Sequence, residues 1–239
     1  MMRADQLIVV RGLFESRARA QAAIEAGKVS ADGATVRKPS QLLAEDAQII
    51  AEPAHPYVSR GALKLEAALD HFRIDPKDKI CLDVGASTGG FTEMLLSRGA
   101  SKVYAVDTGT AQLHPKLKQD PRVISLEQTD IRKLDEAAIP DDARLIVIDV
   151  SFISLELVLP QALNFAAPHA ELIALIKPQF EAGREHVKKG IVRDPEVHMA
   201  VCQRVELLVG RQGWRLRGTI ASPILGGDGN AEFLLYAEH

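Results

Sequence analysis

Two lysines and two carboxylates are the residues of this chain best suited to proton transfer. They follow one another as Lys64, Asp149, Lys177 and Glu232, near the ends of segments that we expect to be helices or strands. A lysine becomes a general base when burial and a neighbouring cation lower its pKa from about 10.4 towards neutrality. We expect Lys64 to be the cation beside Lys177, with the two carboxylates holding the pair and offsetting its charge. These four residues predict a catalytic site for proton transfer.

The sequence CLDVGASTGGF at residues 81–91 predicts a strand that ends in a glycine-rich turn and opens a helix. Such a turn lets a ligand approach the backbone at the carboxyl edge of a sheet, with its negative end at the helix N-terminus. The spacing G-x-x-x-G-G differs from that of a dinucleotide-binding turn, and the Gly-Lys-Ser/Thr sequence of a P-loop does not occur. We assign the following residues to cofactor binding: Asp83, Gly85, Ala86, Ser87, Thr88, Gly89, Gly90 and Phe91.

Two further acidic residues follow later strands on the same edge. Asp107 comes after an expected strand at residues 102–106 and can accept hydrogen bonds from both hydroxyls of a ribose. Asp130 follows the next strand and is placed to meet an adenine amino group. Together with Asp83 and a reversed final hairpin, this pattern resembles an S-adenosylmethionine-dependent methyltransferase, and the resemblance implies that cofactor. A nicotinamide dinucleotide remains an alternative, because the acid after the second strand serves both cofactors.

Helices and strands alternate from residue 60 onward, which predicts an open, mostly parallel sheet with helices on both faces. The expected strands are residues 79–84, 102–106, 122–126, 145–150 and 171–176, and the expected helices are 61–72, 88–98, 110–118, 154–166 and 195–211. In the first helix we expect Leu63, Ala67 and Leu69 to point inward. Residues 214–222 and 231–237 then form an antiparallel hairpin with a turn at 226–230. The predicted fold class is α/β, a Rossmann-like methyltransferase sheet with a terminal antiparallel hairpin, preceded by a small α+β domain.

The first 52 residues predict a small separate domain, followed by a linker at 53–59 and the methyltransferase domain at 60–239. Two short helices come first, the second capped by Ser16 and ended by Gly27, and short strands follow. Residues 1–40 carry a net charge of +3, whereas the remainder of the chain carries −6. This asymmetry alone is equally compatible with a surface that binds a polyanion and with an ordinary solvated surface.

The same N-terminal residues resemble the RNA-binding domain named after the fourth small-subunit ribosomal protein. The similar positions are Arg3, Asp5, Leu7, Arg11-Gly12-Leu13, Ser16-Arg17, Ala20, Ile24, Gly27, Val29, Gly33, Val36 and Lys38-Pro39-Ser40. The resemblance implies a basic face that contacts phosphates of folded RNA without selecting a sequence. We expect RNA contacts from Arg3, Arg11, Arg17, Lys28, Arg37, Lys38, Arg60, Arg184, Lys188 and Lys189.

Composition limits the class of protein. Hydrophobic residues make up 46% and charged residues 26% of the 239 residues, as in a globular protein with a substantial core. No apolar run approaches the roughly 18 residues of a membrane span, and Leu7 to Val10 is too short for the apolar part of a signal peptide. Two cysteines, Cys81 and Cys202, suit a reducing compartment. We therefore expect a cytoplasmic protein with no membrane partner and no metal.

The order Lys-Asp-Lys-Glu resembles the catalytic residues of FtsJ-like ribose 2′-O-methyltransferases. A base methyltransferase needs a cysteine nucleophile or an Asn/Asp-Pro-Pro-Tyr/Phe loop, whereas Val-Ser-Phe follows Asp149. The motifs VSRGAxKL at 58–65, DxGASTGGFTE at 83–93, DVSFISL at 149–155, KPQFE at 177–181 and GNxE at 229–232 resemble the TlyA family. That resemblance implies 2′-O-methylation of cytidine in ribosomal RNA, within ribosomal subunits. A haemolysin-type membrane-active protein and an RNA-binding protein with an inactive methyltransferase domain are the alternatives.

Residues 179–194 separate the Lys177 strand from the last long helix. They include two glycines and four cations, with one short apolar cluster at 191–192. A connection of this length inside a compact domain is usually functional or disordered. An ordinary mobile surface loop is the alternative, but we favour a lid that closes on RNA, because it begins two residues after the expected base.

Overall fold

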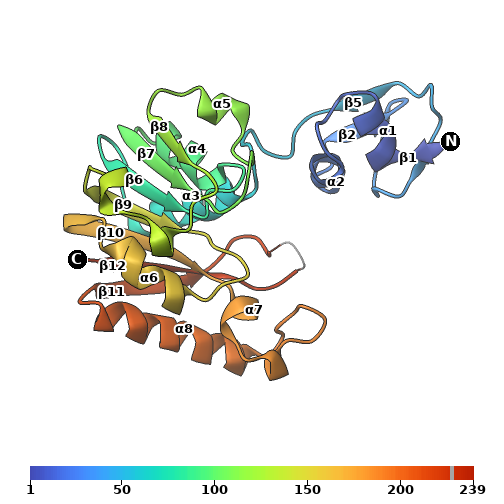
Figure 1. The fold of residues 1–239 in the computed structure, drawn as a ribbon. Coiled ribbons are helices and arrows are strands. Elements are labelled where there is room, and N and C mark those ends of the chain that lie inside the picture. Colours follow the sequence, from blue (N-terminus) through green and yellow to red (C-terminus); the bar gives the residue numbers. More distant parts are fainter. Residues whose placement is uncertain (227–228) are drawn as a thin grey trace. The chain divides into compact units, whose positions relative to one another are not determined.

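The computed structural model of the chain describes residues 1–226 and 229–239. They form two compact units, Met1–Pro56 and Tyr57–His239, each drawn in Figure 1. The expected turn at 226–230 includes residues 227 and 228, which lie outside the described residues.

The N-terminal unit packs two helices against short strands. Its elements are β1 (Met2–Arg3), α1 (Ala4–Val10), α2 (Arg17–Glu25), β2 (Val29–Ala31), β3 (Ala34–Thr35), β4 (Leu42–Leu43) and β5 (Ile49–Ala51). The order β3-β2-β5 forms one small sheet, and β1 pairs with β4. Ser16 caps α2 by accepting a hydrogen bond from the backbone N–H of Arg19, as its position in the sequence predicts. Leu7, Ile8 and Ile24 lie in the core of this unit.

The C-terminal unit is built on a seven-stranded sheet in the order β11-β12-β10-β9-β6-β7-β8 (Figure 1). Its strands are β6 (Ile80–Val84), β7 (Lys102–Val106), β8 (Val123–Leu126), β9 (Ala143–Ile148), β10 (Ala166–Ile176), β11 (Arg215–Ala221) and β12 (Phe233–Glu238). Its helices are α3 (Gly61–Phe72), α4 (Gly90–Ser97), α5 (Pro115–Lys118), α6 (Leu155–Leu163), α7 (Pro178–Glu181) and α8 (Pro195–Arg211), with 3-10 turns at Ile131–Lys133, Glu136–Ala138 and Arg184–His186. Strands β8, β7, β6, β9 and β10 are parallel, while β12 is antiparallel to both of its neighbours. The predicted fold class is confirmed.

Helices cover both faces of this sheet. One core joins the inner residues of α6 and α8 to one face of the strands, and a second core joins α3, α4 and α5 to the other face. The central strands are thus buried on both sides, which explains why each is a continuous apolar run in the sequence. In α3 the buried stripe consists of Ala62, Leu65, Ala68 and Leu69, whereas the expected core residues Leu63 and Ala67 are only partly buried.

Three predicted segments differ from the structure. The expected helix at 110–118 is reduced to α5, because Pro115 has no N–H for a helix interior and occupies the first helical position instead. The expected helix at 154–166 ends at Leu163, and β10 begins at Ala166, earlier than the expected strand at 171–176. Residues 179–194 contain α7, a 3-10 turn and a bridge between Lys188 and Ile191, so this connection is not structureless.

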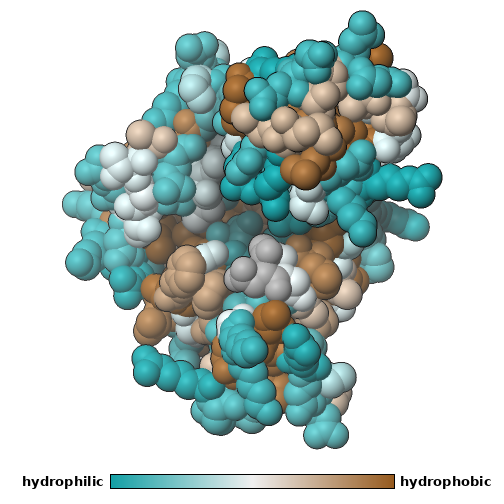
Figure 2. Space-filling model, turned by 90° about the vertical axis from the view of Figure 1, so that its right-hand side faces the viewer, coloured by the Kyte–Doolittle hydropathy of each residue, from teal (hydrophilic) through white to brown (hydrophobic). Residues whose placement is uncertain are grey.

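The surface in Figure 2 is mainly hydrophilic, and its hydrophobic residues form separate patches. Across residues 1–226 and 229–239, no helix combines the length and the apolar character needed to cross a membrane.

Candidate active site

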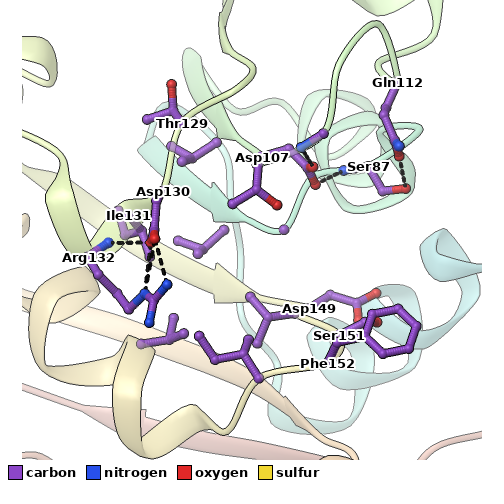
Figure 3. Close-up of a pocket in the computed structure, with 18 residues that line it drawn as sticks. Ser87, Asp107, Gln112, Thr129, Asp130, Ile131, Arg132, Asp149, Ser151 and Phe152 are labelled. Atoms are coloured by element: carbon purple, nitrogen blue, oxygen red, sulfur yellow. Dashed lines mark hydrogen bonds and ion pairs between the residues drawn. The ribbon is translucent and has the colours of Figure 1, made fainter.

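A cavity of about 540 Å³ opens at the carboxyl edge of the parallel strands. Residues that follow β6, β7 and β9 line it, as Figure 3 shows for Ser87, Asp107 and Asp149. Its size is within the range of small-molecule sites, and it lies where open α/β sheets bind their ligands.

The glycine turn after β6 is shaped by a close approach between two strands. Gly85 has a φ of +88°, and a Cβ placed there would lie 2.4 Å from the carbonyl oxygen of Asp149. Gly89 has a φ of +96° and caps the start of α4. A side chain at Gly85 would push the 149 loop away from the cavity, so glycine is required for packing as well as for the turn.

Asp107, which follows β7, binds the backbone of the glycine turn. Its carboxylate accepts hydrogen bonds from the N–H groups of Ser87 at 2.8 Å and Gly109 at 2.7 Å (Figure 3). A carboxylate has about four lone-pair sites, so capacity for further donors remains on the side of the cavity. Asp130 also lines the cavity, but its oxygens accept from the Arg132 side chain, and these hydrogen bonds lower the pKa of Asp130.

Asp83 lies behind the cavity rather than in its wall. Its side chain is fully buried, and the hydroxyl of Thr92 donates to Oδ2 at 2.6 Å. Burial raises the pKa of Asp83 to about 7, and the nearby charge of Asp149 contributes to the rise. The structure thus brings Asp83 to the start of α4, where its contact holds the helix, and not to the ligand side of the turn.

The four expected catalytic residues form two ion pairs, in which Asp149 is half-buried and the other three residues are buried. Lys64 Nζ lies 2.6 Å from Glu232 Oε2, and Lys177 Nζ lies 2.6 Å from Asp149 Oδ1. Lys64, Asp149 and Lys177 line a second cavity of about 290 Å³, together with residues 85–88 of the glycine turn. Each lysine therefore has its own carboxylate, and both reach one polar space beside the larger cavity.

Three residues of the surroundings were not assigned a role from the sequence. Ser151 accepts a hydrogen bond from Lys177 Nζ at 2.8 Å and lines both cavities. Phe152 is 90% exposed at the rim of the larger cavity, with a φ of +65°. Glu181 binds the start of α6. Ser151 and Phe152 lie in the sequence motif around Asp149. The contacts of Glu181 with Ser154 and Leu155 cannot be recognised from sequence spacing.

Asn230 fastens the expected lid to the segment that carries Glu232. Its buried side chain accepts from the N–H of Val192 at 3.1 Å and donates to the carbonyl of Gly190 at 2.9 Å. The C-terminal part of residues 179–194 is therefore held in place, while closure on RNA stays a prediction.

The expected RNA-binding residues fall into three groups. Arg3 and Arg17 both donate to the buried carboxylate of Asp5, and the hydrogen bonds from Arg3 are the main cause of its lowered pKa. Arg11 donates to the carbonyl oxygens of Glu45 and Ala47, so its guanidinium holds a turn, and its contact with RNA stays a prediction. Arg11 and Arg17 are exposed, as are all the remaining residues of the set: Lys28, Arg37, Lys38, Arg60, Arg184, Lys188 and Lys189. Among them, Lys28 lies 3.6 Å from Glu52, and Arg60 lines the smaller cavity.

Comparison with known proteins identifies both units. Residues 57–239 match the FtsJ-like methyltransferase family, and residues 2–49 match the S4 domain. Over 241 residues the chain is 43% identical to TlyA of Mycobacterium tuberculosis, a 16S/23S rRNA (cytidine-2′-O)-methyltransferase, covering 98% of this chain and 88% of that protein. This chain belongs to the TlyA family. It is an FtsJ-like methyltransferase, which replaces the dinucleotide alternative left open by the sequence.

Two further proteins are similar to this chain over nearly its whole length. A provisionally named rRNA methyltransferase of Bacillus subtilis is 48% identical over 241 residues, covering 98% of this chain and 84% of that protein. The solved structure of a Streptococcus thermophilus protein, provisionally described as a haemolysin, has a TM-score of 0.79 and 42% identity, covering 99% of this chain and 87% of that one.

Replacing Asp83 by asparagine tests the buried carboxyl. Because the raised pKa favours the protonated form in the folded state, the contribution of Asp83 to stability is present below pH 4 and is lost as the pH rises through about 7. The amide of Asp83→Asn has no such ionisation and can still accept from Thr92. The free energy of unfolding of both proteins is measured in urea. The value for the variant minus the value for the parent should increase by up to about 4 kcal/mol from pH 4 to pH 8. A difference that does not change with pH would show that Asp83 is not protonated in the fold.

Proposed function

We propose that this enzyme transfers a methyl group from S-adenosylmethionine to the ribose 2′-hydroxyl of cytidine in ribosomal RNA, within ribosomal subunits in the cytoplasm. The observation that carries the proposal is the pair of buried lysine–carboxylate contacts beside the cavity at the glycine turn. The match to the TlyA family supports ribosomal RNA as the substrate, because relatives of that family carry this activity in their names.

The residues of the larger cavity fit this cofactor. Asp107 faces it with free acceptor capacity, which suits the two ribose hydroxyls, and Asp130 lines the part that we assign to the adenine. The glycine turn allows close approach of the rest of the cofactor without a phosphate-binding lysine. When bound, S-adenosylmethionine supplies an electrophilic methyl group on a positively charged sulfur.

Lys177 is the general base in this proposal. Its Nζ would accept the proton that the 2′-hydroxyl loses as the ribose oxygen bonds to the methyl carbon and the bond from that carbon to the cofactor sulfur breaks, and Asp149 and Ser151 hold that Nζ. Lys64, held by Glu232, lines the same space and brings a second positive charge to it. Phe152, exposed at the rim, offers a flat face on which a base can stack.

The cysteines do not suit the alternative of base methylation through a thiolate. Cys81 is buried in β6, and this burial raises the pKa of its thiol to about 12. Cys202 lies on α8, where burial raises the pKa of the thiol to about 11. Both thiols stay protonated near neutral pH, so neither is activated as a nucleophile.

Substitution of Lys177 and Asp107 should separate chemistry from cofactor binding. Lys177→Ala removes the base and should lower the transfer of labelled methyl to ribosomal subunits by about 10²–10⁴-fold, with nearly unchanged cofactor affinity by calorimetry. Asp107→Ala should weaken cofactor binding first. The exposed Lys77→Ala is the control and should behave like the parent. Near-normal turnover of Lys177→Ala would reject the base assignment.

Removal of residues 1–52 should separate RNA affinity from catalysis. Because the two units are compact on their own, the remaining chain should fold and bind the cofactor, yet methylate intact subunits poorly. The logarithm of the binding constant for subunits falls with the logarithm of the salt concentration, and this slope should become shallower by about 0.7–0.9 for each phosphate contact removed. Measurement of methylation and binding between 50 and 200 mM salt (roughly the range in which such slopes are read) checks this. Undiminished activity of the shortened chain would show that the S4 domain is dispensable.

A further inference from the structure

The helical turn after Lys177 contacts the loop after Asp149 at three successive places. Lys177 binds Asp149 and Ser151, the rings of Phe180 and Phe152 lie 5.0 Å apart, and Glu181 binds the residues where the loop enters α6. Phe180 and Glu181 belong to α7, and Lys177 is the residue directly before it. The two segments therefore meet along their length and not only at the ion pair.

Glu181 makes the last and most buried of these contacts. Its side chain is 3% exposed, Oε1 accepts from the N–H of Leu155 at 2.7 Å, and Oε2 accepts from the hydroxyl of Ser154 at 2.7 Å. Leu155 is the first residue of α6, so its N–H has no partner within the helix, and a negative charge there is favourable. Arg204 of α8 lies 3.7 Å from Oε2 and also donates to the Glu181 carbonyl, so the buried charge is compensated.

The loop between β9 and α6 needs such an anchor. It is neither helix nor strand from Asp149 to Ser154, and its exposed residue Phe152 has a left-handed backbone that a non-glycine residue adopts at a cost. A strained segment keeps one conformation only when its surroundings hold both ends. Asp149 is held at one end by Lys177, and the other end is held by Glu181.

We propose that Glu181 is a positioning residue of the transfer reaction: it holds residues 150–154 so that Ser151 stays on Lys177 Nζ and Phe152 stays at the rim of the cavity. The proposal rests on the function proposed above, because it assigns Lys177 the role of base. Glu181 itself touches neither cavity, and its effect passes through the loop.

The test compares Glu181→Ala, Glu181→Gln and the control Ala162→Gly in the full-length chain. Ala162 is buried in α6, so glycine there weakens the same helix and leaves the junction with Glu181 intact. With saturating methyl donor, kcat on ribosomal subunits should fall about 10–100-fold for Glu181→Ala, within the effects of misplaced catalytic groups. It should fall less for Glu181→Gln, because the amide oxygen can still accept from Leu155. Ala162→Gly should lower the melting temperature to a similar extent but keep kcat within about threefold.

Amide hydrogen exchange of residues 150–155 in the free enzyme is the second measurement. Exchange should quicken by at least about tenfold in Glu181→Ala and stay unchanged in Ala162→Gly. Ser154→Ala also removes the cap contact with the N–H of Glu156, but added to Glu181→Ala it should lower kcat by less than the product of the two single losses, because the two changes share the Ser154–Glu181 contact. Equal loss of kcat in Ala162→Gly, or unchanged exchange and kcat in Glu181→Ala, would overturn the proposal. If the parent enzyme methylates no ribose, the proposed function fails, while exchange still decides whether Glu181 holds the loop.

Discussion

The burial of two lysines at one edge of the sheet is the constraint on which the rest of this site depends. A buried charge without a partner is strongly destabilising, so each lysine must meet a carboxylate. Lys64 joins α3 to the segment before β12 through Glu232, and Lys177 joins the end of β10 to the end of β9 through Asp149. Segments that are up to 168 residues apart in the chain are thereby held at one place. The same contacts that satisfy the charges assemble the site.

The backbone around Asp149 limits what the neighbouring residues can be. Its carbonyl passes so close to Gly85 that a side chain there is excluded, while its carboxylate holds Lys177. The glycine turn thus has two roles, since it leaves room for a cofactor and lets the 149 loop approach β6. One consequence is that the two cavities share Gly85, Ser87, Asp149 and Ser151 as lining residues. Donor and acceptor of the methyl group can therefore meet across a single loop.

The sequence predicts most of the sheet, because strands buried on both faces appear as continuous apolar runs. It also places Lys64 on a helix, Asp149 and Lys177 at the ends of strands, and Glu232 at the start of the last strand. It does not show which lysine meets which carboxylate, since that depends on distant pairing. The helix expected at residues 110–118 is too long, because Pro115 allows the helix to begin only at that residue. The resemblance to the RNA-binding domain predicts an RNA contact for Arg11 but not its hydrogen bonds to two backbone carbonyls, which depend on residues 34 and 36 positions later. Glu181 could not be found by spacing, because its partners lie 26 and 27 residues earlier in the chain.

The chemical identity of the methylated product tests the central claim most directly. Ribosomal subunits would be incubated with the purified enzyme and labelled methyl donor, and the RNA digested to nucleosides for mass spectrometry. The account predicts that the label is recovered in 2′-O-methylcytidine, with the methyl group lost together with the ribose when the glycosidic bond is cleaved. Label that remains on the free base, or labelled protein with unlabelled RNA, would contradict it.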